Sequence, residues 1–426
     1  MKSLIDAVAP KRLGVGFRWL LASSWLSNTG DGIAIAAGPL LVASLTHNAV
    51  LIAAGALLQW LPDLLFSLWA GALADRLDRR RIVVAVDLAR AAVLVVLALT
   101  IVTHTVSVGL VLTTLFVVGT AEVFADTTTS TLMPMLVHRD DLAVGNARIQ
   151  IGLITVNQLA GPPIGAALFT AGAAWPFASQ AALVAFGAIL VSRIALPAHG
   201  REKARNTAIA TDIAEGVRWV RHHPAVRTLV MTIFTFNITF GAAWSVLVIY
   251  ATRHLGLGPA GFGLITTVSA AGGLLGTLSY GSIIKRVSLG NIMRVGLIIE
   301  TLTHLGLALA TSAWIAMPIF FVFGAHAFIW GTTSITVRQR AVPTELQGRV
   351  GSVNSVGVFG GLVIGAGIGG LLAQDIGITA PFWFAFAGSA LFVVLIWRQL
   401  THIAHTDAAP APGVRSVPAH PDLGPS

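Results

Sequence analysis

Long apolar runs, separated by short polar stretches, recur along the whole chain. Each run holds about 20 residues or more, and a helix of that length crosses a hydrocarbon core of about 30 Å. The hydrophobic pattern therefore predicts an all-α, polytopic membrane protein with twelve transmembrane helices. These runs cover residues 17–43, 48–73, 82–103, 106–130, 143–170, 173–196, 225–252, 258–284, 291–311, 313–337, 350–373 and 379–398.

The composition agrees with a chain that lies largely in lipid. Of its 426 residues 55% are hydrophobic and 11% are charged, whereas a soluble domain carries about 25% charged residues. The chain has no cysteine, which excludes disulfides and thiolate chemistry. None of its lysines follows a glycine, so the Gly-Lys pair of a phosphate-binding loop is absent. We expect neither an enzyme nor a bound cofactor, and no cleavable signal peptide.

The basic residues indicate how the chain is oriented. Cytoplasmic loops of membrane proteins carry the excess of Lys and Arg. With the twelve predicted spans, every Lys and Arg except Arg253 falls on one side, which we assign to the cytoplasm together with both termini. The formal net charge of +9 then reports orientation in a bilayer, and we expect no nucleic-acid partner.

The longest segment between spans divides them into six and six. It covers residues 197–224 and separates an N-terminal half, 1–196, from a C-terminal half, 225–398. Within it, residues 209–221 place apolar side chains at helical spacing with Arg218 and Arg221 elsewhere around the helix, which predicts an amphipathic helix on the inner leaflet or a simple linker helix. Residues 399–426 are rich in proline and are expected to be a disordered cytoplasmic tail.

A cluster of charges lies between the second and third runs. The stretch Gly71-Ala72-Leu73-Ala74-Asp75-Arg76-Leu77-Asp78-Arg79-Arg80-Arg81 resembles the loop between spans 2 and 3 of major facilitator superfamily transporters, with Asp78 where that signature has glycine. The resemblance implies two pseudo-symmetric six-helix halves and a conformational latch at this loop. Its implied residues are Gly71, Asp75, Arg76, Arg79, Arg80 and, in span 4, Asp126. The alternative is that these arginines only fix the topology.

Ionisable residues within the predicted spans are the next candidates. A charged group in mid-bilayer costs several kcal/mol and is a functional hypothesis by default. The candidates for proton coupling are Asp31 in span 1, Asp63 in span 2, Glu122 in span 4, Glu300 in span 9 and His326 in span 10. Asp31 and Glu122 come first, because spans 1 and 4 line the central cavity of the family that the chain resembles. The alternative is a protonated or hydrogen-bonded structural group.

Two further features bear on the direction and mechanism of transport. Span 5 contains Gly161-Pro162-Pro163-Ile164-Gly165-Ala166, which is similar to the Gly-Pro-x-x-Gly-Gly element of facilitators that export by antiport, although an ordinary proline kink is the alternative. Span 4 lacks the arginine that many drug and proton antiporters carry, and Leu115 is its nearest position. That absence, with phrases such as Asp87-Leu88-Ala89-Arg90, favours the subgroup similar to enterobactin exporters and macrolide-efflux proteins.

The combined expectation is a monomeric exporter in the bacterial inner membrane that moves a small amphipathic or hydrophobic molecule outward against an inward flow of protons. Its apolar cargo wall is expected to include Trp60, Phe240, Trp244 and Trp330. Two alternatives remain: a dedicated exporter of a siderophore or other natural product, and a non-transporting receptor or scaffold with the same fold.

Overall fold

The computed structural model describes residues 10–195, 209–343 and 346–400. Within these ranges the side chains at positions 11, 75, 76, 139 and 209–213 lie outside the description. The predicted disorder of residues 399–426 and the first part of the predicted linker, residues 197–208, fall almost entirely outside the described chain. All regular structure in the described ranges is helical.

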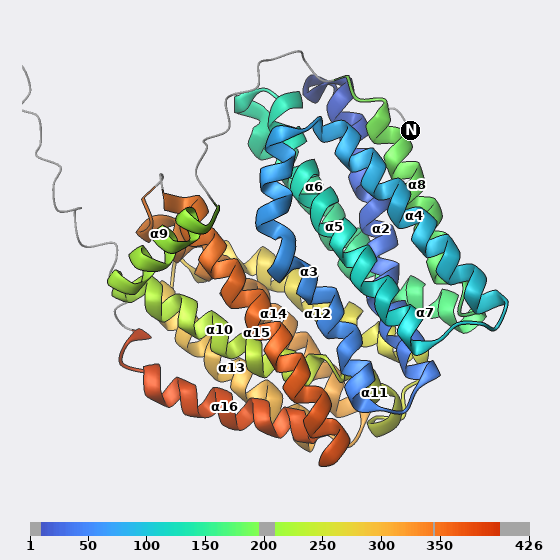
Figure 1. The fold of residues 1–426 in the computed structure, drawn as a ribbon. Coiled ribbons are helices and arrows are strands. Elements are labelled where there is room, and N and C mark those ends of the chain that lie inside the picture. The colour runs from blue at the N-terminus through green and yellow to red at the C-terminus, as the bar shows by residue number, and fades with distance from the viewer. Residues whose placement is uncertain (1–9, 196–208, 344–345, 401–426) are drawn as a thin grey trace, which may run out of the picture.

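The helices form two bundles (Figure 1). The N-terminal bundle consists of α2 (Gly14–Leu45), α3 (Ala49–Arg76), α4 (Arg79–Val102), α5 (Val108–Leu136), α6 (Leu142–Gly152), the π-helix η3 (Leu153–Ala160), α7 (Gly161–Ala171) and α8 (Trp175–Ser192). The C-terminal bundle consists of α10 (Pro224–Trp244), α11 (Leu247–Ile249), the π-helix η4 (Tyr250–His254), α12 (Pro259–Ile283), α13 (Leu289–Leu309), α14 (Ala313–Ala341), α15 (Gln347–Asp375) and α16 (Ala380–Ile396). Along the chain, α9 (Ile209–His222) comes after the helices of the N-terminal bundle and before those of the C-terminal bundle.

Most of the predicted spans are long and apolar enough to cross a bilayer. Ten segments of the described chain meet that requirement, one of them the continuous run Leu142–Ala171 that α6, η3 and α7 share. The two remaining predicted spans correspond to α2, which has 32 residues, and to the shorter apolar helix α16. Polar side chains start several of these helices: Asn48, Asp78 and Ser107 each accept a hydrogen bond from a backbone N–H in the first turn of the following helix.

The two bundles come together at one end. Figure 1 shows them spreading apart toward α6 and α9, which we name the basic end because Arg79–Arg81, Arg218 and Arg221 lie there, and converging toward α11, the opposite end. At the opposite end the backbone N–H of Ala49 donates to Oε1 of Gln374 at 2.8 Å. Arg253 donates to the backbone carbonyls of Thr46 and His47. One apolar core at this end joins residues of both bundles.

The helix α9 is attached to the C-terminal bundle. Glu215 of α9 forms an ion pair with Arg349 of α15, with 2.7 Å between Oε2 and Nη1. A side chain at Gly216 would meet the carbonyl of Arg349, so glycine allows the two helices to approach closely at this point.

Candidate functional site

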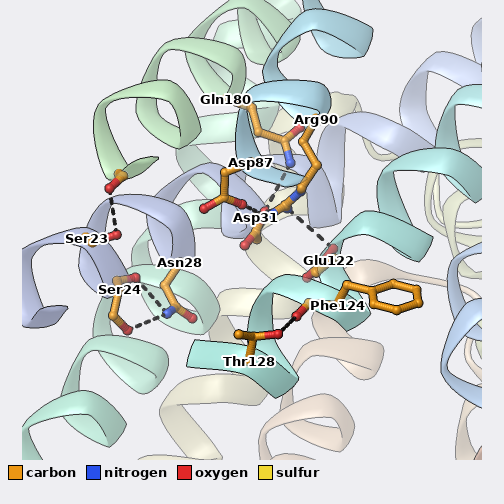
Figure 2. A network of polar contacts seen from close by, with 11 residues as sticks. Ser23, Ser24, Asn28, Asp31, Asp87, Arg90, Glu122, Phe124, Thr128 and Gln180 are labelled. Carbon is orange, nitrogen blue, oxygen red and sulfur yellow. Dashed lines mark hydrogen bonds and ion pairs between the residues drawn. The ribbon is translucent and has the colours of Figure 1, made fainter. Parts of the chain in front are cut away.

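A buried arginine in the middle of α4 is the centre of the candidate site. Arg90 follows the first residue of α4 by eleven positions, which places it about 16 Å along the helix. Its guanidinium lies 2.6 Å from Asp31 of α2, 3.3 Å from Asp87 of its own helix and 3.7 Å from Glu122 of α5. The Arg90 side chain is 1% exposed. Figure 2 shows the three carboxyl groups converging on it from three helices.

The position of Asp31 is fixed from a fourth helix. Nε2 of Gln180 in α8 donates to Oδ1 of Asp31 at 3.2 Å, the same oxygen that Arg90 contacts (Figure 2). A side chain at Gly30 would meet Gln180, and one at Gly32 would meet the backbone of Asn157 in η3. The glycines on both sides of Asp31 therefore let α2 approach α8 and η3 closely, which holds the carboxylate against its two donors.

The three carboxyl groups outnumber the guanidinium. If all three are ionised, two negative charges remain without a partner in a site surrounded by helices, and unpaired charge inside a membrane protein is costly. The cluster is electrically neutral when two of the three carboxyls hold protons. Its composition is therefore suited to binding and releasing protons, with Arg90 pairing in turn with whichever carboxyl is ionised.

A cavity of about 380 Å³, which we name the acidic cavity because four carboxyl side chains line it, opens beside this cluster in the N-terminal bundle. Asp31 and Glu122 face it, and so do Asp63 of α3 and Asp126, one turn after Glu122 on α5. Trp60 supplies an aromatic wall. The structure thus brings together three of the residues predicted for proton coupling, and it adds Asp126, which was predicted for the latch.

Arg90 corrects the sequence analysis in two respects. The prediction that every basic residue except Arg253 lies on the cytoplasmic side is wrong for Arg90, whose side chain is buried among helices. The arginine missing from span 4 has a counterpart in span 3, since Arg90 reaches Glu122 across the contact between α4 and α5. Asp87, 3% exposed, was also missed as a site residue. The signal available was the Asp-x-x-Arg spacing inside an apolar run, which places both side chains on one helical face.

The two predicted residues of the C-terminal half lie elsewhere. Nε2 of His326 in α14 is 3.5 Å from Oε2 of Glu300 in α13, and both side chains are largely buried. Neither residue lines the acidic cavity.

Except for Asp126, which lines the acidic cavity, the residues predicted for the latch lie at the basic end. Nε of Arg79 donates to the backbone carbonyl of Ala74, and its Nη1 lies 2.9 Å from the sulfur of Met135. Arg80 donates to the carbonyl of Ile194. Gly71 lies in the last turns of α3 with open space at its Cα, and the side chains of Asp75 and Arg76 fall outside the described ones. The latch stays a prediction.

The bend predicted in span 5 packs directly on the site. The π-helix η3 ends at Ala160, and Pro162 lies in the first turn of α7. A side chain at Gly161 would meet Gly32, and one at Gly165 would meet the carbonyl of Ile33. Both glycines therefore press α7 against the turn of α2 that carries Asp31, and Ala166 is fully buried.

A second, smaller pocket of about 170 Å³ lies between the bundles. Residues of both bundles line it, among them Ile35, Pro162, Trp244 and Phe320. Trp244 stacks on Phe240 with 4.3 Å between ring centroids and lies 4.6 Å from Phe323. Two of the aromatic residues predicted for a cargo wall, Phe240 and Trp244, therefore form one cluster at this pocket.

The chain is similar in sequence to known efflux proteins. The chain is 28% identical to the multidrug efflux pump Tap of Mycolicibacterium fortuitum, over 92% of this chain and 97% of that protein. It is 23% identical to macrolide efflux protein A of Streptococcus pyogenes, over 82% and 87% of the two chains.

Solved structures share the fold. A bacterial homologue of the iron transporter ferroportin, solved in an inward-facing state, superposes with a TM-score of 0.72 at 16% identity over 91% of this chain and 98% of that chain. The nucleoside transporter NupG superposes with a TM-score of 0.70 at 12% identity over 93% and 100%. Residues 5–421 match the family described as transmembrane secretion effector. The chain is therefore a multi-pass membrane protein that belongs to this family of the major facilitator superfamily.

Proposed function

We propose that this protein is a secondary active exporter of small amphipathic drugs, driven by protons that bind at the Arg90 cluster. The observation that carries the proposal is one buried guanidinium shared by Asp31, Asp87 and Glu122 beside the acidic cavity. The names of the two relatives support drugs as cargo. The basic end is assigned to the cytoplasm, because it carries the excess of arginine.

Proton binding changes what holds α2, α4 and α5 together. With Asp31 ionised, Arg90 bridges α4 to α2 at 2.6 Å, while Glu122 is the more distant partner at 3.7 Å. A proton on Asp31 weakens that bridge and favours the pair with Glu122, so the packing of three helices responds to a single proton. One proton moving inward at 100 mV supplies about 2.3 kcal/mol from the electrical term. A scaffold that does not transport has no need for such a cluster.

Asp31→Asn and Glu122→Gln test the proton site, because each keeps the side-chain volume and removes the titration. In everted vesicles with an acidified lumen, the proposed antiport carries erythromycin into the lumen and protons out of it, so the wild-type protein should alkalinise the lumen when erythromycin is added. Both variants should show a proton flux at least tenfold lower. Both should still accumulate in the membrane. Asp140→Asn, at an exposed position, is the matched control. Wild-type flux in both neutralised variants would contradict the proposal.

We further propose that Asp75 and Arg79 balance the two access states at the basic end. Asp75→Asn should weaken the contact between the bundle ends and slow transport, and it should leave binding of erythromycin unchanged. Thiol labelling of a cysteine introduced at the basic end of α14 measures the shift, since the chain has no cysteine of its own. Unchanged labelling together with unchanged transport would leave these arginines as topology charges only.

A further inference from the structure

A second group of titratable side chains lies inside the C-terminal bundle. Glu300 and His304 are four residues apart on α13 and therefore share one face of that helix. His326 of α14 faces the same position, with its Nε2 3.5 Å from Oε2 of Glu300. A side chain at Gly296, one turn before Glu300, would meet the rings of Trp330 and His326, so this glycine makes room for both rings.

His304 is buried in an unusual way. Its side chain has no exposed surface, and neither ring nitrogen has a hydrogen-bond partner in the described chain. A neutral imidazole carries one donor and one acceptor, and both are normally paired when they are buried. His304 therefore keeps an unused donor and an unused acceptor beside the His326–Glu300 pair.

Other charges are remote from this group. On α13 the next one is Arg294, six residues before Glu300, which donates to the carbonyl of Trp397. On α14 they are Arg338 and Arg340 in the last turn. Among the described residues, α16 contributes no ionisable side chain, α12 contributes Tyr280 near Thr333, and α10 contributes Arg227 near its start. A proton in the group is therefore held by Glu300, His304 and His326 alone.

The group lies directly behind the aromatic cluster of the pocket between the bundles. His304 packs edge-on against Trp244 with 6.3 Å between ring centroids. His326 packs edge-on against Phe323 at 6.1 Å, and Phe323 contacts Trp244. Trp244 itself lines the pocket. A charge that appears on either imidazole acts on π-systems that form the wall of that pocket.

We propose that Glu300, His304 and His326 form a second proton-binding site, and that its protonation sets how strongly the pocket between the bundles holds its cargo. The coupling to cargo rests on the proposed export function, and the proton site itself does not. With Glu300 ionised and both imidazoles neutral the group carries one negative charge. One proton makes it neutral, and a second makes it positive behind the aromatic wall.

The titration can be read from Trp244 without any ligand. We would label the purified full-length protein with 5-fluorotryptophan and assign the Trp244 resonance among the 11 tryptophans with Trp244→Phe. The ¹⁹F shift of Trp244 should titrate between pH 5 and 8. Glu300→Gln should move the midpoint about one unit lower, because the carboxylate that favours the imidazolium is gone. His304→Asn should abolish most of the change.

Two controls separate this site from the Arg90 cluster. Trp175, 59% exposed in the N-terminal bundle, should show none of this titration. Asp31→Asn should lose proton-coupled transport and keep the Trp244 titration unchanged. The proposal would be overturned, even if the protein exports drugs, by a Trp244 resonance that is invariant with pH. It would also be overturned if Glu300→Gln and His304→Asn both titrated as the wild type does.

The coupling to cargo is tested with erythromycin, whose amine is protonated across this range. Its dissociation constant, read from the same Trp244 resonance, should differ at least threefold between pH 5.5 and pH 7.5 in the wild type. In His304→Asn the ratio should fall to about one, and in Glu300→Gln it should be smaller than in the wild type. An equal affinity at both pH values in the wild type, or no effect of erythromycin on Trp244, would overturn the coupling.

Discussion

Arg90 is held by an excess of negative partners. Its guanidinium has three carboxyl neighbours and a fork geometry that allows it to contact two of them at once, as Nη1 does with Asp87 and Nη2 with Asp31. A lysine would offer a single point charge at this position. In the proposed mechanism Arg90 is the common counter-ion of the three carboxyls, and its burial distinguishes it from the exposed arginines at the basic end.

Removing Arg90 should destabilise the protein in a way that removing a carboxyl can correct. Arg90→Met leaves three neighbouring carboxyls without a cation, and breaking a buried ion pair on one side costs about 3–5 kcal/mol. We expect low accumulation of the variant at neutral pH, measured by fluorescence-detected size exclusion. Partial recovery is expected in Arg90→Met combined with Asp87→Asn, since fewer unpaired charges remain.

The matched control for that change is Arg81→Met, because the Arg81 side chain is 83% exposed. It should accumulate as the wild type does. If Arg90→Met accumulates normally, or if adding Asp87→Asn lowers accumulation further, Arg90 is not the counter-ion of this cluster.

At this scale the sequence predicted part of the site. Asp31, Asp63 and Glu122 stand out in the sequence because the rule that basic loops face the cytoplasm does not account for a carboxyl inside an apolar run. The structure places all three at one cavity. Arg90 was missed because it was counted among the cytoplasmic basic residues of the positive-inside pattern, although it lies inside the predicted span 82–103. Only the three-dimensional contact of α4 with α2 and α5 shows that its partners come from other spans.

The position of Asp31 depends on the close contact between α7 and α2. Gly165→Ala should lower the stability of the protein, because the added methyl group meets the carbonyl of Ile33, and overpacking typically costs about 1–3 kcal/mol. Without that contact, alanine in a helix would be favoured over glycine by about 1 kcal/mol. The expected sign is therefore opposite to the helix propensity. The midpoint of thermal unfolding in detergent measures it.

Gly367→Ala is the control for Gly165→Ala, since this glycine lies within α15 and has open space at its Cα. Its unfolding midpoint should stay level or rise. A fall of the same size in both variants would mean that the loss at Gly165 reflects no specific packing.

The start of α10 should respond to pH. Nδ1 of His223 accepts the backbone N–H of Val226, which requires a neutral ring, and burial lowers the pKa of His223 below its ordinary value of 6.5. The folded state then binds fewer protons than the unfolded state, so the stability of this cap is complete above pH 6.5 and declines as the pH falls below it. Amide exchange at Val226 should accelerate on acidification.

His223→Asn separates the cap from the titration. Asparagine is a good N-cap and does not titrate in this range. Exchange at Val226 should become independent of pH between 5 and 8, after correction for the intrinsic rate. An unchanged pH dependence in this variant would assign the effect to another group.

The helices themselves could be predicted far better than their interruptions. Apolar runs of membrane-spanning length indicate where α3, α4 and α5 lie. In lipid a single segment can pair all its backbone N–H and C=O groups only by forming a helix. The π-helix η3 and the break between α10 and α11 could not be predicted. The sequence Leu153–Ala160 reads as ordinary apolar helix, and its wider turns arise where it packs against α2 and α12.

For the whole molecule, the closed end lies at α11 and the two bundles spread toward the basic end (Figure 1). At the rim of the closed end the contacts between the bundles are polar, with Ala49, Gln374 and Arg253 as hydrogen-bonding residues. Below them α3 and α15 pack closely, because a side chain at Gly370 would meet Ala53. Export by alternating access requires these contacts to open and the basic end to close.

Locking the closed end should therefore stop transport. In the absence of native cysteines, the pair Ala53→Cys and Gly370→Cys can join α3 to α15 once the two helices shift slightly apart to admit a side chain at Gly370. Oxidation should lower erythromycin transport at least tenfold. A reductant should restore transport, because the two bundles can separate again once the disulfide is broken. Each single cysteine variant, treated with the same oxidant, controls for damage elsewhere. Full transport in completely cross-linked protein would show that α3 and α15 do not separate during export.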